Sequence, residues 1–339
     1  MSRWLYHVSR SLCTGLLMAG MGAGSALASG GDAPAVVAET PGFNDLVDDN
    51  ADIQQLFGGA KWSEGPLALP DGSVIWSDIK NNRVMVWREG EEVGEWLRPA
   101  QFHNGHALDH EGRVIAASHG KRAVERQNED GQWEVLADLD GEQKLNSPND
   151  LVVDARGRIW FTDPTFGIDE PEEGYGGRSV TGGEYVYRFD PESDELTRLS
   201  TPAVKTPNGL AFAPGENTLY IADSELGHDR ENDSLNHHIV AYDVDEDGAL
   251  ANERIFAEVS PGVPDGIKVD EHGNVWSSSD SGLQVFNPDG ERLGRIDLPE
   301  RTANLAFAEH GGQHYLFVTA TSSLYRIPVN VGEARSQRD

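Results

Sequence analysis

Residues 145–167 read LNSPNDLVVDARGRIWFTDPTFG, a pattern of strand and turn that recurs along the chain. Two apolar runs, LVV and IWF, flank the polar segment DARGR, which predicts a strand, a turn and a second strand. The first strand opens on Pro148, Asn149 and Asp150. These residues would suit a simple turn, and they would equally suit a site that holds a ligand.

Six copies of this pattern occur in the chain. Each copy begins with a polar residue, continues into a short apolar strand and ends in a turn rich in Gly or Asp. A large apolar residue lies eleven positions after the polar one in every copy, so all copies share one register. The leading residues are Glu64, Asn104, Asn149, Asn208, Asp265 and Asn304, and the apolar residues are Ile75, Ile115, Trp160, Leu219, Trp276 and Tyr315.

The spacing of the copies indicates the architecture. The leading residues are 40, 45, 59, 57 and 39 positions apart. This spacing fits one four-stranded sheet per repeat, and six such sheets form a β-propeller. A β-sandwich is the alternative all-β fold, but it does not explain a register that all six copies share. We therefore predict a six-bladed β-propeller over residues 46–332.

A propeller gives the six leading residues a common position. The innermost strand of each blade runs along the central channel in the same direction, so its first residue always lies at the same end of that channel. The leading residues should therefore form a ring around one mouth. The second strand of each blade returns to this mouth. The long connections after it, residues 164–184 and 224–237, should overhang the ring and carry specificity.

The predicted ring supplies two carboxylates and four amides, all of which are oxygen donors. Oxygen ligands without His or Cys favour Ca²⁺ over zinc or copper, and two carboxylates would neutralise a divalent ion. Asn-Gly and Asp-Gly pairs are also common turn formers. Six polar residues in one register nevertheless favour a central metal site over six unrelated turns.

His119 is expected near the ring because it ends the second strand of the second blade. Two interpretations stay open for this residue. It is either a surface histidine, which is the commoner case, or a proton carrier beside the metal. No nucleophile elbow, phosphate loop or dinucleotide motif occurs in the sequence.

The first 28 residues predict a secretory signal peptide. Arg3 and Arg10 give a basic head, residues 11–28 carry no charge, and Ala26-Leu27-Ala28 fits a cleavage site. A membrane anchor is the alternative, but this uncharged segment falls short of the ~20 apolar residues of a spanning helix. Cleavage would remove Cys13, the only cysteine, so the exported chain would have no disulfide and no thiol nucleophile.

The remaining composition narrows the partners and the location. Residues 29–45 are predicted to be a flexible leader. The net charge of −30 would repel the phosphates of nucleic acid, and so acidic a surface suits a salty medium. We predict a periplasmic or secreted protein with a small-molecule substrate. No nucleic acid, no protein partner and, after cleavage, no membrane is expected to bind it.

The repeated motifs resemble those of the SMP-30/gluconolactonase/LRE family, over about residues 45–330. Two of the motifs, Asn-Ser-Pro-Asn-Asp and Phe-Thr-Asp-Pro, are together similar to the bacterial gluconolactonase branch. The matching segments are Ser63-Glu-Gly-Pro66, Trp76-Ser-Asp-Ile79, Asn146-Ser-Pro-Asn-Asp150, Phe161-Thr-Asp-Pro164, Pro207-Asn-Gly-Leu-Ala-Phe212, Leu219-Tyr-Ile-Ala-Asp223 and Pro264-Asp-Gly266.

The resemblance implies a divalent ion, usually Ca²⁺, at the centre of the propeller, with Glu64, Asn149, Asn208 and Asp265 as its ligands. The family includes sugar lactonases and phosphotriesterase-type hydrolases. Animal members carry an arginine that holds the sugar acid two residues before the matching asparagine. Ser147 stands at that position here, which leaves the identity of the substrate open.

The expected activity is metal-dependent hydrolysis of a sugar lactone. Asp265 is expected to be a ligand and the general base, Glu64 a ligand only, and Asp150 a support for the ring. The residues expected to contact substrate are Asn149, Asn104, His119 and Asn304. The alternatives are a phosphotriesterase-type hydrolase that uses the same site, and a non-catalytic binding propeller with a structural Ca²⁺.

Overall fold

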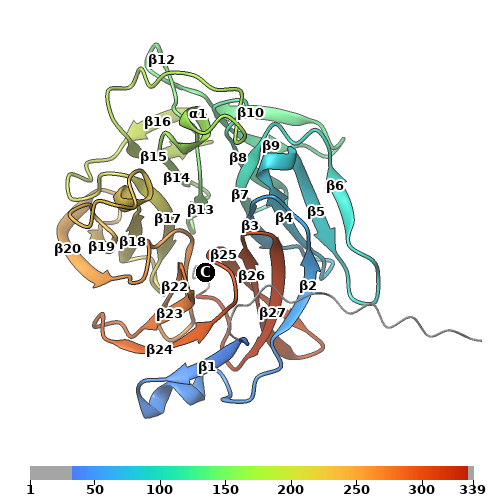
Figure 1. The fold of residues 1–339 in the computed structure, drawn as a ribbon. Coiled ribbons are helices and arrows are strands. Elements are labelled where there is room, and N and C mark those ends of the chain that lie inside the picture. The colour runs from blue at the N-terminus through green and yellow to red at the C-terminus, as the bar shows by residue number, and fades with distance from the viewer. Residues whose placement is uncertain (1–32, 335–339) are drawn as a thin grey trace, which may run out of the picture. The chain divides into compact units, whose positions relative to one another are not determined.

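The computed structural model describes residues 33–334, and the structural statements below refer to these residues. They form six sheets of four or five strands and one two-stranded ribbon. The six sheets lie around one centre in Figure 1, and in each of them consecutive strands pair with one another. The predicted six-bladed β-propeller is therefore confirmed. The signal peptide predicted for residues 1–28 lies outside the described residues.

The first three blades each consist of four consecutive antiparallel strands, from the innermost to the outermost. Blade 1 contains β3 (Ser63–Ala68), β4 (Val74–Asp78), β5 (Arg83–Trp87) and β6 (Gly94–Leu97). Blade 2 contains β7 (His103–Leu108), β8 (Val114–Ser118), β9 (Ala123–Gln127) and β10 (Trp133–Ala137). Blade 3 contains β13 (Leu151–Val153), β14 (Ile159–Asp163), β15 (Tyr185–Asp190) and β16 (Glu195–Arg198).

The other three blades include two strands that come from the beginning of the described chain. Blade 4 contains β17 (Pro207–Phe212), β18 (Thr218–Asp223), β19 (His238–Val244) and β20 (Leu250–Glu258). Blade 5 contains β21 (Ile267–Val269), β22 (Val275–Ser279), β23 (Gly282–Phe286), β24 (Arg292–Asp297) and β1 (Ala35–Ala38). Blade 6 contains β25 (Thr302–His310), β26 (Gln313–Ala320), β27 (Ser323–Val329) and β2 (Gln54–Gly58).

The remaining elements are short and lie in the connections. They are β11 (Leu139–Asp140), β12 (Gln143–Lys144), the α-helix α1 (Phe166–Asp169) and the 3-10 helices η1 (Pro41–Asp45), η2 (Ile79–Asn81) and η3 (Glu225–Gly227). None of the described helices is long and apolar enough to span a bilayer.

Blade 6 is closed by a strand from the other end of the chain. β2 pairs antiparallel with β27, so the last sheet takes its outermost strand from the N-terminal side of blade 1. Figure 1 shows β2 in blue beside β27 in red. This pairing covers an edge that would otherwise leave backbone groups unpaired, and it joins the first and last blades of the ring.

The flexible leader predicted for residues 29–45 overlaps two regular elements, β1 and η1, while residues 29–32 lie outside the described part of the chain. β1 pairs with β24 along all four of its residues. η1 follows, and its Phe43 is fully buried in a cluster with blades 5 and 6. Gly294 on β24 makes room for this ring, since a Cβ there would lie 2.5 Å from Phe43 Cδ1. The folded unit therefore begins before residue 46.

The spacing of eleven positions that all six repeats share is explained by the second strand of each blade, which buries the large apolar residue. Five of the six apolar residues eleven positions after the leaders are fully buried, and Tyr315 is half-buried. In blades 3 and 5 an aspartate at the end of the inner strand anchors the tryptophan opposite it. Trp160 Nε1 donates to Asp154 Oδ2 over 2.8 Å, and Trp276 Nε1 donates to Asp270 Oδ2 over 2.9 Å.

Candidate functional site

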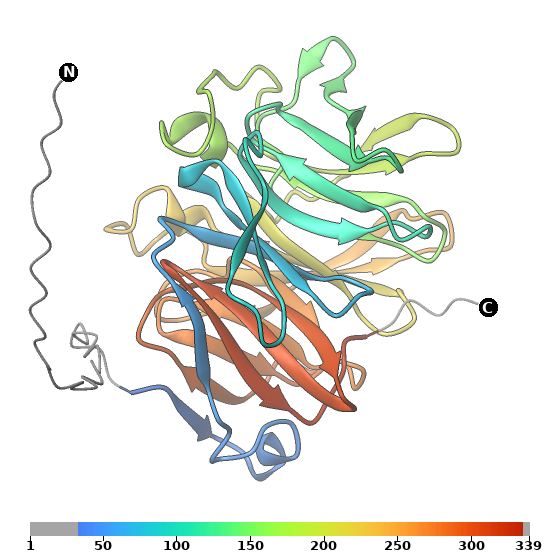
Figure 2. The same cartoon turned by 90° about the vertical axis from the view of Figure 1, so that its right-hand side faces the viewer.

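A pocket of about 300 Å³ lies at the mouth where the inner strands begin. Five of the six leading residues line it, namely Glu64, Asn104, Asn149, Asn208 and Asp265. The two long connections predicted to overhang the ring contribute Phe166, Glu170 and Glu173 on one side and Ser224, Gly227 and Arg230 on the other. In Figure 2 both connections extend from the same side of the blades. The remaining lining residues are Trp62, Lys80, Val263 and Arg301.

The glycines that follow the leading residues bring the inner strands together at this mouth. Gly105 N donates to Asn149 O over 2.8 Å, and Gly209 N donates to Asp265 O over 2.9 Å. A Cβ at Gly105 would lie 2.5 Å from Asp150 Oδ1. The Asn-Gly pairs are therefore required by the close approach of neighbouring blades, rather than by a turn.

Two buried carboxylates face this pocket. Glu64 is 2% exposed, and burial raises its pKa well above the usual range, with further contributions from the negative charges of Asp265 and Asp150. Burial also raises the pKa of Asp265, to about 6, even though the positive charge of Arg301 acts in the opposite direction. The site therefore resists holding both carboxylates in the charged form unless a cation joins them.

Asp150 and Asn304 form a support next to this pair. Asn304 Nδ2 donates to Asp150 Oδ2 over 3.2 Å, and Asn304 Oδ1 accepts from Leu305 N over 2.8 Å. Asp150 behaves as the sequence predicted for a supporting residue. Asn304 is different from the other leaders, because both ends of its carboxamide bond to protein and it does not line the pocket.

His119 is 1% exposed, so the interpretation as a surface histidine is wrong. Its Nδ1 lies 3.0 Å from Glu173 O, and its Nε2 lies 3.3 Å from Asn104 Nδ2. Burial lowers the pKa of His119 to about 4. The residue lies behind Asn104 and not on the pocket wall, and Asn104 Oδ1 is left buried without a hydrogen-bond partner among the described residues.

The rim of the pocket carries three cations in a strongly acidic chain. Arg301 lies over the ring of Trp62, with its guanidinium carbon 4.4 Å from the ring centre. Lys80 pairs with Glu173 at 3.3 Å. Arg230 pairs with Asp280 at 2.6 Å, and Asp280 also lies 3.8 Å from Arg301. Both overhanging connections are thus tied to the blades by ion pairs beside the pocket.

The donor set suits a hard cation. Within residues 33–334 no group of three or more His, Cys, Asp or Glu side chains is arranged to hold a metal. The ring instead offers two carboxylates and three amides, all with oxygen donors, which is the ligand chemistry of Ca²⁺. The unpaired Asn104 Oδ1 and the raised pKa values of Glu64 and Asp265 fit residues that would hold a cation.

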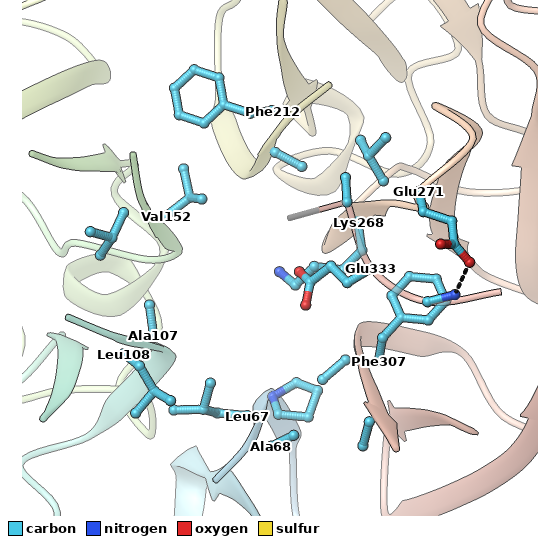
Figure 3. Close-up of a pocket in the computed structure, with 18 of the residues that line it drawn as sticks. Leu67, Ala68, Ala107, Leu108, Val152, Phe212, Lys268, Glu271, Phe307 and Glu333 are labelled. Carbon is cyan, nitrogen blue, oxygen red and sulfur yellow. Dashed lines mark hydrogen bonds between the residues drawn. The ribbon is translucent and has the colours of Figure 1, made fainter. Parts of the chain in front are cut away.

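A second and larger cavity, of about 1170 Å³, lies at the other ends of the inner strands. Its wall combines apolar residues, with Leu67, Leu108, Val152 and Phe307 among them, and charged residues such as Glu271, as Figure 3 shows. In Figure 3 the side chains of Lys268 and Glu333 point toward the centre of this cavity. This cavity shares no residue with the smaller pocket and contains none of the six leading residues, so the candidate site is the smaller pocket.

Several residues of the pocket were not found by sequence reasoning. Trp62 and Lys80 flank matched motifs, and their proximity to Glu64 in the sequence could have identified Trp62. Arg301 and Arg230 have no sequence signal, since one lies between blades and the other in a long connection. Their position follows only from how the blades are packed.

Comparison with known proteins shows which family this chain is similar to. A model of the SMP-30/Gluconolactonase/LRE-like region matches residues 62–322. A gluconolactonase of Zymomonas mobilis is 28% identical over 319 residues, which cover 85% of this chain and 84% of that protein. A pentonolactonase of Haloferax volcanii is 29% identical over 252 residues, covering 72% and 76% respectively.

The same grouping is found among solved structures. The structure of a gluconolactonase of Xanthomonas campestris is 36% identical to this chain and superposes on it with a TM-score of 0.80. The match covers 88% of this chain and 96% of that protein. The similarity therefore includes all six blades and is not limited to one motif.

Proposed function

We propose that this chain, which belongs to the SMP-30/gluconolactonase/LRE-like family, is a lactonase that hydrolyses the ring ester of a sugar lactone. The observation that carries the proposal is the convergence of Glu64, Asn149, Asn208 and Asp265 in one pocket of about 300 Å³. The names of the relatives support a lactone as substrate. The pocket is of a size that suits a single sugar ring rather than a polymer.

The four converging residues are proposed to hold a divalent cation, with Ca²⁺ as the expected metal. Two carboxylates balance its charge, and amide oxygens complete a set of hard ligands. Such a cation would polarise a carbonyl oxygen and stabilise the negative charge that develops there. Asn149, which lines the pocket with the other proposed ligands, is proposed to contact the substrate as well as the cation.

Asp265 is proposed as the general base. Its backbone N donates to Ser278 Oγ over 3.0 Å, which fixes the start of the inner strand and the direction of the side chain. Among the four converging residues only Asp265 and Glu64 carry a carboxylate that can accept a proton, whereas the amide side chains of Asn149 and Asn208 cannot. Asp265 would take a proton from water as the water oxygen attacks the ester carbonyl. The bond between the carbonyl carbon and the ring oxygen would then break, and the proton would pass to that oxygen, which gives an open-chain hydroxy acid.

The rim is proposed to hold the sugar. Trp62 and Arg301 both line the pocket. The aromatic ring would pack against the carbon face of a sugar, and the guanidinium would donate to its hydroxyl oxygens. Ser147, which stands where animal members carry an arginine, donates from Oγ to Pro164 O over 2.7 Å. It therefore serves the backbone of the long connection and leaves substrate binding to residues of other blades.

The test is a pH-indicator assay of the purified protein with aldonolactones, in Ca²⁺ and in chelator. We expect ring opening faster than in buffer, and loss of activity in chelator. A phosphotriester is assayed in parallel. Turnover of the phosphotriester alone would replace the lactonase proposal with the second hydrolase class. Tight Ca²⁺ binding without turnover of any substrate would instead indicate a binding propeller.

We also propose that the enzyme works in the periplasm or outside the cell. The basis is the predicted signal peptide at residues 1–28. Besides the proposed cation, a small lactone is the only binding partner that the proposal requires.

A further inference from the structure

His119 makes two hydrogen bonds whose directions follow from simple chemistry. A backbone carbonyl can only accept, so the contact between His119 Nδ1 and Glu173 O requires a proton on Nδ1. The ring is 1% exposed and has no carboxylate partner within the described part of the chain, which keeps it neutral. In a neutral imidazole with a proton on Nδ1, Nε2 is an acceptor.

The orientation of the Asn104 carboxamide follows from this tautomer. Nε2 of His119 can accept only from the amino end of the carboxamide, which lies 3.3 Å away as Nδ2. Oδ1 must then point away from His119. It is buried and accepts no hydrogen bond from any described residue. An unpaired buried acceptor costs roughly 1–3 kcal/mol, so this oxygen is placed for a partner that the polypeptide does not supply.

We propose that His119 is a positioning residue that holds Asn104 Oδ1 toward the ring, and that Asn104 is a fifth oxygen ligand of the cation. The inference rests on the proposed metal site. Asn104 lines the same pocket as Glu64, Asn149 and Asp265. Its Oδ1 is closed to solvent, which suits a bare cation enclosed by the ring and disfavours a substrate hydroxyl, which would need an open path.

The same histidine links the ring to the connection that overhangs it. Glu173, whose carbonyl holds His119, lines the pocket together with Phe166 of α1. Gly167 of α1 packs directly on the imidazole, since a Cβ there would lie 2.5 Å from His119 Nδ1. The position of this connection therefore determines the position of the imidazole, and through it the direction of Asn104 Oδ1.

Calorimetric titration with Ca²⁺ tests the ligand role without measuring turnover. His119→Phe, which cannot accept from Asn104, should weaken Ca²⁺ binding by roughly the 10–100-fold seen for residues that orient metal ligands. His119→Gln can donate to Glu173 O and accept from Asn104 Nδ2, so it should restore most of the affinity. In an Asn104→Ala background, His119→Phe should cost no further affinity, because its effect passes through Asn104.

Two more variants keep the test decisive if His119→Phe does not fold. Gly167→Ala leaves both side chains intact but displaces the imidazole, so it should also weaken Ca²⁺ binding. His110→Gln is the matched control. His110 bonds to Asp154 O at the other end of the inner strands, and its replacement should leave Ca²⁺ affinity unchanged.

The double variant, Asn104→Ala with His119→Phe, gives the deciding comparison. Equal loss of affinity in Asn104→Ala and in the double variant supports the proposal, and additive losses overturn it.

A nitrogen-15 NMR spectrum of the imidazole, recorded in chelator, separates this inference from the proposed function. The expected signature is a neutral ring protonated at Nδ1 in the wild type. A ring protonated at Nε2 would overturn the positioning role and leave the lactonase proposal untouched. The expected tautomer together with no Ca²⁺ binding by the wild type would overturn the metal centre and with it the ligand role of Asn104.

Discussion

Asp265 illustrates how burial among like charges prepares a residue to bind a cation and to accept a proton. Its carboxylate lies among the negative charges of Glu64, Asp150 and Glu173, and burial raises its pKa to about 6. A cation would relieve this repulsion, and a free lone pair would still accept a proton. Asn208, which lines the same pocket, can supply an oxygen to a metal but cannot act as a base.

The substitution Asp265→Asn should separate these two tasks. Asparagine keeps an oxygen donor of the same size, so the variant should still bind Ca²⁺, though more weakly because one negative charge is lost. It cannot accept a proton at neutral pH, so lactone turnover should fall by roughly the 10²–10⁴-fold typical of a lost general base. Calorimetry with Ca²⁺ and a lactone assay on the same preparation measure both effects.

Asn208→Asp is the matched control for this experiment. It adds a charge and leaves the base in place, so it should bind Ca²⁺ at least as well as the wild type and keep part of the activity. Near wild-type turnover by Asp265→Asn would show that the base lies elsewhere in the pocket. Apart from the proposed ligand Glu64, the other carboxylates there are Glu170 and Glu173.

The raised pKa of Asp265 also predicts how the stability of the metal-free protein depends on pH. The folded pKa of about 6 lies above the ~3.9 of an unfolded aspartate. Between these values the native state binds more protons, so the contribution of Asp265 to the free energy of unfolding decreases as pH rises. In chelator, the melting temperature of Asp265→Asn should therefore rise relative to that of the wild type as pH increases from 4 to 7.

Asp71 provides a control of opposite sign. Hydrogen bonds from Ser73 lower the pKa of Asp71, so this residue stabilises the protein more as pH rises. The melting temperature of Asp71→Asn should therefore decrease relative to that of the wild type as pH rises. If the two variants respond to pH in the same direction, general charge repulsion is the cause and the argument about Asp265 is wrong.

At the scale of the element, the six inner strands share one design. A polar residue opens the strand, a glycine after most of the leaders lets the next blade approach, and apolar residues continue into the core. The site is built from strand ends on a rigid scaffold, while the connections above it carry Phe166, Glu173 and Arg230. Changes in an outer element should therefore affect stability without affecting the pocket.

Phe43→Ala tests this separation. Phe43 of η1 is fully buried against blades 5 and 6 and does not line the pocket. Its truncation should lower the free energy of unfolding by about 3–5 kcal/mol, while kcat and KM for the lactone stay unchanged at a temperature where the variant is folded. Denaturant unfolding and steady-state kinetics give the two quantities.

Ile255→Ala is the matched control for Phe43→Ala. Ile255 lies on the outermost strand of blade 4 and is 59% exposed, so its truncation should change stability little. A Phe43→Ala protein with wild-type stability would show that β1 and η1 are dispensable, in agreement with a flexible leader.

At the scale of the whole molecule, charge is the dominant feature. The chain carries 57 acidic and 27 basic residues. The described part of the chain contains many ion pairs, but most are at the surface, where each contributes ~0–1 kcal/mol. Repulsion among the unpaired carboxylates is therefore expected to outweigh them at low ionic strength.

Added salt should consequently stabilise the protein. Raising NaCl toward 1 M shortens the Debye length to about 3 Å, which screens carboxylate repulsion over the whole surface. The melting temperature in chelator should rise steadily with NaCl and equally with KCl, as scanning calorimetry would show. A melting temperature that falls with salt would mean that the ion pairs dominate.

Export should leave a chain that begins at or near Ser29. This prediction depends on the sequence of residues 1–28, which lie outside the described structure. The intact mass of exported protein should show the loss of about the first 28 residues by signal cleavage. Ala28→Arg disrupts the small-residue site and should accumulate the uncleaved form. A full-length chain in the soluble exported fraction would contradict the signal peptide.

The sequence by itself determined the architecture and the members of the ring. Six copies of one register predict six blades because an inner strand must alternate with a second strand that buries a large residue such as Trp160. The same register brings Glu64, Asn149, Asn208 and Asp265 to one mouth, since every inner strand runs in the same direction. Both results follow from a repeated motif, and such a motif can be recognised from short stretches of sequence.

Only the tertiary structure decided which residues complete the site and how they are oriented. Arg301 and Trp62 meet across the junction of blades 6 and 1, and no local pattern records that contact. Asn304 shares the register of the other leaders, yet Asp150 and Leu305 N occupy its carboxamide. His119 is buried because α1, which follows it by more than 40 residues, packs over its ring. The physical reason is common to all three, since burial and hydrogen-bond partners depend on the packing of distant segments.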